Sequence, residues 1–231
     1  MSTTLTLRLT KGSQLTTEEL DNNFTALDSS IDSAAGSLLP NNNTWTGTNE
    51  FTAGLESPGA GSNSTRIGTL AGSTSQGTLA VAIGNEAGQT SQGAQSIAIG
   101  GDAGAGSQGT KSISIGYLTG QTSQGTNAVA MGYNSGRVDQ SDYAVAVGNS
   151  AGNNDQGLNA VAVGAGSGGT DQGNYAVAVG NTAGAQTQGQ YAVAMGELAG
   201  ATTQGANSVA VGLNAGNNTQ GASSVAVGYL A

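Results

Sequence analysis

One short unit recurs along most of this sequence, and a clear copy of it is Tyr175-Ala-Val-Ala-Val-Gly180-Asn-Thr-Ala-Gly184-Ala-Gln-Thr-Gln188-Gly189-Gln190. The glycine at the position of Gly184 recurs every sixteen residues from Gly72 to Gly216, and the glutamine at the position of Gln188 recurs with the same period from Gln76 to Gln220. These two series are called the second glycine ladder and the glutamine ladder, and the first glycine ladder follows the strand core. Self-similarity at a fixed period is typical of solenoids, so each sixteen-residue unit is interpreted as one coil. The glycine after the Val-Ala-Val core returns once in every unit without insertion, at Gly68, Gly84, Gly100, Gly116, Gly132, Gly148, Gly164, Gly180, Gly196, Gly212 and Gly228.

The Val-Ala-Val core of each unit predicts a short strand, because it alternates with period two and contains β-branched residues. The glycines fit corners, where positive φ or close backbone approach is needed. Apolar residues do not recur at helical spacing here. We therefore predict an all-β fold over residues 64–231, a parallel β-roll or β-solenoid of about ten coils. Each strand would pair with its copy in the next coil, about 4.8 Å away.

Both faces of these predicted strands are uncharged. One face carries Val or Ile, as at Val145 and Val147, and the other carries Ala or Ser, as at Ala144 and Ala146. A strand that is apolar on both faces is normally buried on both, so we expect an oligomer. We expect the larger side chains to fill the roll and the small ones to allow close contact with a neighbouring copy. The opposite assignment of the two faces stays open.

The composition excludes several classes of protein. The 231 residues include 40 glycines, 8% charged residues, no His and no Cys, with a net charge of −9. Disulfides, Cys/His metal sites and His-based catalytic triads are therefore ruled out. The five Lys and Arg residues are dispersed, which argues against nucleic-acid binding. No apolar run approaches the ~20 residues of a membrane span. We expect no enzymatic activity and no cofactor, with a carboxylate pair across a subunit cleft as the one catalytic alternative.

The first third of the chain has a different pattern. Thr16 and Glu19 fit a capping box, which predicts a helix over residues 17–34. Its apolar positions follow a heptad seam, which predicts a short trimeric coiled coil, and an amphipathic helix packed on its own chain is the alternative. Residues 1–36 would form an attachment segment, made of a short strand at residues 5–9 and this helix, and the Gly-, Pro- and Asn-rich residues 37–63 would form a connector. The predicted trimerisation residues are Leu20, Phe24, Leu27 and Ile31.

The repeat units resemble the head repeats of trimeric autotransporter adhesins. The resemblance is carried by Asn207-Ser-Val-Ala-Val-Gly212, Gln95-Ser-Ile-Ala-Ile-Gly100 and Tyr143-Ala-Val-Ala-Val-Gly148. It implies a left-handed parallel β-roll in a tightly packed homotrimer that binds host surfaces. The Gln-Gly between units departs from that family's pattern.

The N-terminal residues resemble a second group, the tail-fibre-like virion proteins of bacteriophages. This resemblance is carried by Leu9-Thr-Lys-Gly-Ser-Gln-Leu-Thr-Thr-Glu-Glu-Leu-Asp-Asn-Asn-Phe-Thr-Ala-Leu27 and by Asn43-Thr-Trp-Thr-Gly-Thr-Asn-Glu-Phe51. It implies that residues 1–36 bind the tail, baseplate or an adaptor protein, and that the rod projects outward toward host-surface polysaccharide. The first residues lack the pattern of a signal peptide, as expected for a virion protein made in the host cytoplasm.

Together the two resemblances imply a structural tail fibre that contributes to host adhesion. A capsid head-fibre or decoration protein and a fragment of a bacterial trimeric adhesin are the alternatives.

Three sets of side chains share a register and are candidate sites. The glutamine ladder is interpreted as amides that hydrogen-bond to the copies above and below, with a binding surface as the alternative. Asp139, Asp155 and Asp171 would stack at one coil spacing, which suggests either a shared Ca²⁺ or carboxylates that splay into solvent. Tyr175 and Tyr191 share a register, as do Tyr117 and Tyr133. Such pairs are interpreted as packing pairs, and a glycan contact at Tyr175 and Tyr191 is the alternative.

Overall fold

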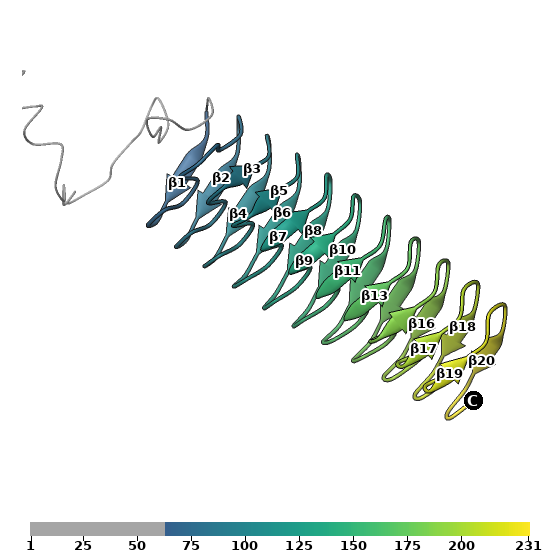
Figure 1. The fold of residues 1–231 in the computed structure, drawn as a ribbon. Coiled ribbons are helices and arrows are strands. Elements are labelled where there is room, and N and C mark those ends of the chain that lie inside the picture. The colour runs from purple at the N-terminus through teal and green to yellow at the C-terminus, as the bar shows by residue number, and fades with distance from the viewer. Residues whose placement is uncertain (1–62) are drawn as a thin grey trace, which may run out of the picture. The chain divides into compact units, whose positions relative to one another are not determined.

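The computed structural model describes residues 63–231, and these form a parallel β-solenoid with one coil for each repeat of the sequence. Figure 1 shows the coils stacked one after another in a single direction. The predicted fold class is confirmed for the repeats. The attachment segment 1–36, with its predicted helix, and nearly all of the predicted connector 37–63 lie outside the described residues.

Every coil contributes a strand to an 11-stranded parallel sheet, and most contribute a second strand to a 9-stranded parallel sheet. The larger sheet contains β1 (Thr65–Ile67), β2 (Val81–Ile83), β4 (Ile97–Ile99), β6 (Ile113–Ile115), β8 (Val129–Met131), β10 (Val145–Val147), β12 (Val161–Val163), β14 (Val177–Val179), β16 (Val193–Met195), β18 (Val209–Val211) and β20 (Val225–Val227). The smaller sheet contains β3 (Ser91–Gln92), β5 (Ser107–Gln108), β7 (Thr122–Gln124), β9 (Val138–Gln140), β11 (Asn154–Gln156), β13 (Thr170–Gln172), β15 (Thr187–Gln188), β17 (Thr203–Gln204) and β19 (Thr219–Gln220).

The register is the predicted one, in which each strand residue pairs with its copy in the neighbouring coil. Val145 is opposite Val161, and Ala146 is opposite Ala162. Because the same residue types stack along the whole rod, each coil presents nearly the same surface to the next, as in other solenoids.

Small side chains and glutamines fill the space between the two sheets. The alanine at the centre of each larger-sheet strand is completely buried from Ala82 to Ala210, except where Ser114 replaces it. A second row of alanines, such as Ala183 and Ala199, packs against the first. Among residues 63–231, the largest fully buried side chains are glutamines. The interior is therefore narrow and only partly apolar.

The expectation that the larger aliphatic residues fill the roll is wrong. Val145 and Val147 are partly exposed, whereas Ala146 between them is buried. The physical reason lies on the opposite sheet, where Gln156 points inward and its Nε2 donates to the Val145 carbonyl oxygen at 2.8 Å. A side chain that crosses the interior leaves room only for a methyl group on the facing strand, so the branched side chains face outward.

The glutamines also bond to one another along the rod. Gln156 Nε2 donates to Gln172 Oε1 at 3.1 Å, and the same amide-to-amide bond joins each neighbouring pair from Gln124 to Gln220. Within the first coils the Nε2 bonds persist, but the Oε1 atoms of Gln76, Gln92 and Gln108 are buried without a partner. The predicted amide ladder is thus confirmed over the later coils.

Two glycine ladders are needed for different reasons. Gly148 has φ +137°, and a Cβ placed on it would lie 2.6 Å from the carbonyl oxygen of Gly164 in the next coil. Gly152 has φ +51°, and its Cβ would lie 2.7 Å from the side chain of Gln156. The first ladder therefore permits the coil spacing, and the second makes room for the buried glutamine.

We predict that Gly148→Ala strongly destabilises the rod. The left-handed backbone alone costs about 1–3 kcal/mol for a residue with a side chain, and the clash with the next coil adds to this. Gly221→Ala is the matched control, because Gly221 needs no positive φ and a Cβ placed on it would have no other atom within 4 Å. Thermal unfolding of both variants checks this, and equal melting temperatures would contradict the proposed role of the ladder.

Candidate functional site

The outward side of the larger sheet is a continuous aliphatic face. It consists of the first and third residues of each strand in that sheet, and apart from Thr65 these are all Val, Ile or Met. Eleven strands at about 4.8 Å spacing make this face roughly 50 Å long. The described strands bring no charged side chain onto it, because Arg66 occupies the middle, inward-facing position of β1 and its Nη1 donates to the Gly72 carbonyl oxygen at 2.7 Å.

Parts of the aliphatic face are open to water in the single chain. Met131 is 39% exposed, Met195 is 44% exposed and Ile67 is 49% exposed. A soluble monomer rarely exposes an uninterrupted apolar strip of this length, and such patches usually mark an interaction surface. The sequence pattern places the aliphatic residues together on one side of each strand. The alternation of Val and Ala does not show whether this side faces the interior of the coil or its exterior.

The tyrosines that share a register are stacked on each other. The ring centroids of Tyr175 and Tyr191 lie 5.1 Å apart with the planes at 12°, and those of Tyr117 and Tyr133 lie 5.9 Å apart at 22°. Each pair covers one ring face of each partner. This geometry supports the interpretation as packing pairs, and glycan contact at Tyr175 and Tyr191 stays a prediction.

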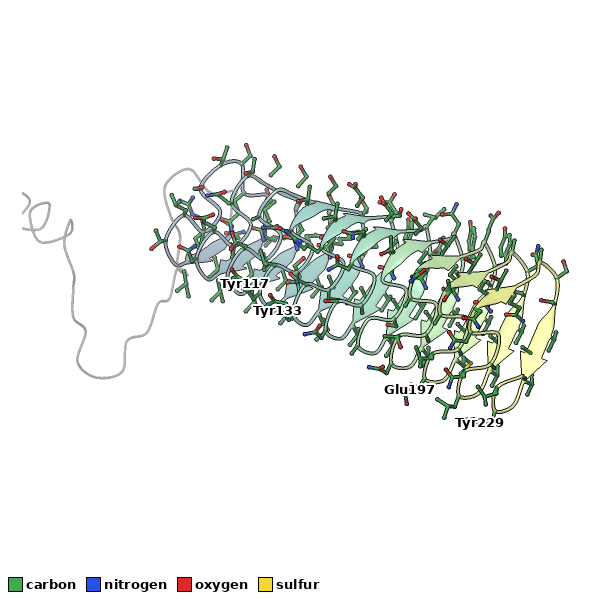
Figure 2. The ribbon with its side chains drawn as sticks, turned by 60° about the horizontal axis from the view of Figure 1, so that its bottom comes forward. Tyr117, Tyr133, Glu197 and Tyr229 are labelled. Atoms are coloured by element: carbon green, nitrogen blue, oxygen red, sulfur yellow. The ribbon has the colours of Figure 1, made fainter. Side chains whose placement is uncertain are left out.

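The two tyrosine pairs occupy different positions of the coil. Tyr117 and Tyr133 directly follow the glycine after a larger-sheet strand, whereas Tyr175 and Tyr191 lie two residues before such a strand. Figure 2 shows Tyr117, Tyr133, Glu197 and Tyr229 along one edge of the coils. Tyrosines thus flank the strands of the aliphatic face on both sides.

The three aspartates are the exposed middle residues of β9, β11 and β13 in the smaller sheet. Asp139, Asp155 and Asp171 each have φ +50°, and the two residues beside them, rather than the aspartates, form the pairs with the neighbouring strand. Aspartate tolerates left-handed backbone better than most residues, which gives these positions a structural explanation. Within residues 63–231, no group of three or more His, Cys, Asp or Glu side chains is placed to hold a metal ion, and a Ca²⁺ shared by these three aspartates stays a prediction.

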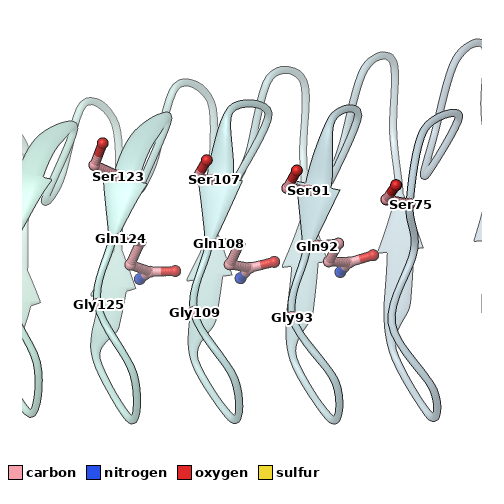
Figure 3. A pocket seen from close by; sticks show the side chains of 10 residues that line it. All are labelled: Ser75, Ser91, Gln92, Gly93, Ser107, Gln108, Gly109, Ser123, Gln124 and Gly125. Carbon is pink, nitrogen blue, oxygen red and sulfur yellow. The ribbon is translucent and has the colours of Figure 1, made fainter.

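A shallow groove runs over the first coils of the smaller sheet. Figure 3 shows its row of serine hydroxyls, Ser75, Ser91, Ser107 and Ser123, above the row of glutamine carboxamides. The same position holds Asp or Thr in the later coils, so the groove coincides with the smallest side chains. Its lining contains no charged group, so these residues offer hydrogen bonds and no acid or base.

The predicted trimerisation residues Leu20, Phe24, Leu27 and Ile31 lie outside the described residues. In the part of the chain that the structure covers, no helix has the length and apolarity needed to cross a membrane.

Comparison with known proteins connects this geometry to one family. The family model of the YadA head domain repeat matches two stretches of the chain, residues 122–135 and 188–215. No curated protein and no solved structure matches the chain. The matched stretches contain the aliphatic strands β8, β16 and β18, three of the buried glutamines (Gln124, Gln188 and Gln204) and the glycine corners between them. These two stretches are therefore similar to YadA head repeats, and they lie within the β-solenoid that residues 63–231 form.

Proposed function

We propose that this chain is a non-enzymatic, adhesin-like surface protein that assembles as a homotrimeric rod. The observation that carries the proposal is the aliphatic face, which runs along the rod and has no partner within a single chain. Burial of apolar area stabilises by about 25 cal/mol per Å², so covering this face with further copies is strongly favourable. The resemblance to trimeric head repeats supports three copies, and a closed three-fold arrangement covers the face of every subunit.

The narrow interior supports the same proposal. Alanines and glutamines bury little apolar area in each coil. A chain with such an interior needs additional apolar burial to offset the conformational entropy of ordering its coils. Assembly through the aliphatic face supplies this burial. The rod and its partners would then fold as one unit.

We predict that Val177→Glu weakens the assembly. The substitution places a charge in the middle of the aliphatic face, where burial in an interface costs several kcal/mol for each ion. Thr187→Glu is the matched control, because Thr187 lies in the same coil, is exposed and belongs to the smaller sheet. Sedimentation over a dilution series should show the trimer mass for the wild type and the control, and dissociation of Val177→Glu at higher concentration.

Two results would contradict this proposal. One is a wild-type chain that sediments as a monomer at all concentrations. The other is identical dissociation of Val177→Glu and Thr187→Glu, which would show that the aliphatic face does not form the subunit interface.

The location of the rod is a separate part of the proposal. The match to the head repeats favours the surface of a bacterium, where a trimeric adhesin would reach a host. The resemblance of residues 9–27 and 43–51 to phage fibre proteins favours a virion tail, and a decoration protein on the head is a further alternative. In each case several copies of a weak site would raise avidity.

Antibody labelling of intact bacteria and of purified virions separates these alternatives. We expect label at an outer surface, on the cell for an adhesin or on the tail for a fibre. Label over the virion head would indicate a decoration protein instead. Label confined to the cell interior would contradict an adhesive function at any surface.

A further inference from the structure

The residue two positions before each larger-sheet strand forms a row along one edge of the rod. Tyr143, Asn159, Tyr175 and Tyr191 are consecutive members of this row. Their φ angles are +59°, +55°, +60° and +60°, so all four share one left-handed backbone conformation. Their amides also pair in the same way, as when Tyr175 N donates to Leu158 O and Asn159 N donates to Asp142 O. The four side chains therefore leave the backbone in nearly the same direction.

The row contains a gap at Asn159. Tyr175 and Tyr191 stack at 5.1 Å, which is one coil spacing. Tyr143 and Tyr175 are two coils apart, so their Cα atoms lie about 10 Å from each other. The side chain between them is the short amide of Asn159, which leaves a slot above it. Tyr143 is 54% exposed and Tyr175 is 43% exposed, so both walls of the slot are accessible in the chain.

The neighbours of Tyr175 determine which of its faces is free. Tyr191 covers the face on the C-terminal side. The other face is directed toward Tyr143 across the slot. The stacked partner also fixes the orientation of the Tyr175 ring, so less side-chain entropy is lost when a ligand binds.

The width of the slot selects the shape of the ligand. Carbon atoms in contact lie about 3.5–4.0 Å apart, so a flat ring between two tyrosines needs only about 7–8 Å. A slot of about 10 Å is too wide for a flat aromatic ring and fits a thicker, saturated ring. The negative faces of aromatic rings also attract the polarised C–H groups that a pyranose presents on both sides.

Amide groups at the base of the slot match the hydroxyls of such a ring. Asn159 is exposed, and within residues 63–231 its carboxamide makes no hydrogen bond to another side chain or to the backbone. Asn174 Oδ1 accepts a hydrogen bond from Leu158 N at 2.9 Å, which holds this side chain next to Asn159 and leaves its Nδ2 free to donate. The slot therefore offers both donors and acceptors between two aromatic walls.

We propose that the slot between Tyr143 and Tyr175 binds a single pyranose ring of a glycan. The proposal deepens the adhesive function and rests on it for its biological role, but the slot is formed within one chain. A trimer would present three such slots, which raises the avidity for a polysaccharide. This site differs from the stacked faces of Tyr175 and Tyr191, which are already occupied by each other.

The test uses the full chain and four probes, the methyl pyranosides of glucose, galactose, mannose and N-acetylglucosamine. Saturation-transfer NMR from tyrosine ring protons should detect at least one of them, with saturable binding on the order of 1 mM. In Asn159→Tyr, a tyrosine fills the slot at a backbone position that already accepts tyrosine in three coils. We expect this variant to keep its melting temperature and to bind at least tenfold more weakly.

Tyr191→Asn is the matched control, because it exchanges the same two residue types outside the slot. It should keep the affinity within about threefold, since both walls remain, although the loss of the stacked partner frees Tyr175. Saturable binding to none of the four probes, or unchanged affinity in Asn159→Tyr, would overturn the proposal.

Sedimentation of the same samples separates this proposal from the proposed function. A wild-type monomer that still binds the probe would contradict the trimeric rod and leave the slot intact. Loss of the trimer in Asn159→Tyr would place this row in the subunit interface and overturn the proposed slot.

Discussion

The bond from each buried glutamine to the opposite sheet is the interaction on which the rest of this structure depends. Gln156 reaches across the interior to the carbonyl oxygen of Val145, and its copies do the same in the other coils. A buried amide without partners is costly, so its hydrogen bonds fix both the distance between the sheets and the register of the coils. The narrow gap accepts alanine on the facing strand and directs valine outward. A glycine is required at position 152, because any side chain there would collide with the buried Gln156.

A rod built in this way has a spine of buried amides and one aliphatic face on its exterior, whereas an ordinary globular domain buries most of its large aliphatic side chains. Each coil contacts mainly its neighbours, so stability accumulates along the stack. The aliphatic face contributes little to a single chain and much to an assembly. The same arrangement that makes the rod regular therefore makes its stability depend on contact with other copies. The residue two positions before each larger-sheet strand, at the edge of this face, differs in type from coil to coil. The change from tyrosine to asparagine at position 159 is one such variation, and it generates a slot at one point of an otherwise repetitive surface.

Much of the fold could be predicted from the sequence, because a strict, uninterrupted period specifies parallel strands in register. The amide ladder was also predictable, since a glutamine in every unit has no simpler explanation. The direction of the two strand faces was not, because Val145 and Ala146 are both uncharged and periodicity alone does not distinguish inside from outside. The deciding information lay on the other strand, where Gln156 takes up the interior. The stacking of Tyr175 on Tyr191 followed from their shared register, whereas the slot at Asn159 required the common left-handed backbone that only the structure shows. The predicted contacts of residues 1–36 remain predictions.

Hydrogen exchange of the glutamine side-chain amides, measured on the 231-residue chain, tests directly whether these amides are buried and hydrogen-bonded. Selective ¹⁵N labelling of glutamine allows the Nε2 protons of the ladder and of the exposed Gln186 to be followed by NMR after transfer to D₂O. The account predicts strong protection from Gln124 to Gln204, where both amide-to-carbonyl and amide-to-amide bonds are present, and immediate exchange at Gln186. Immediate exchange of every glutamine side chain in a folded sample would contradict a buried amide spine and, with it, the outward direction of the aliphatic face.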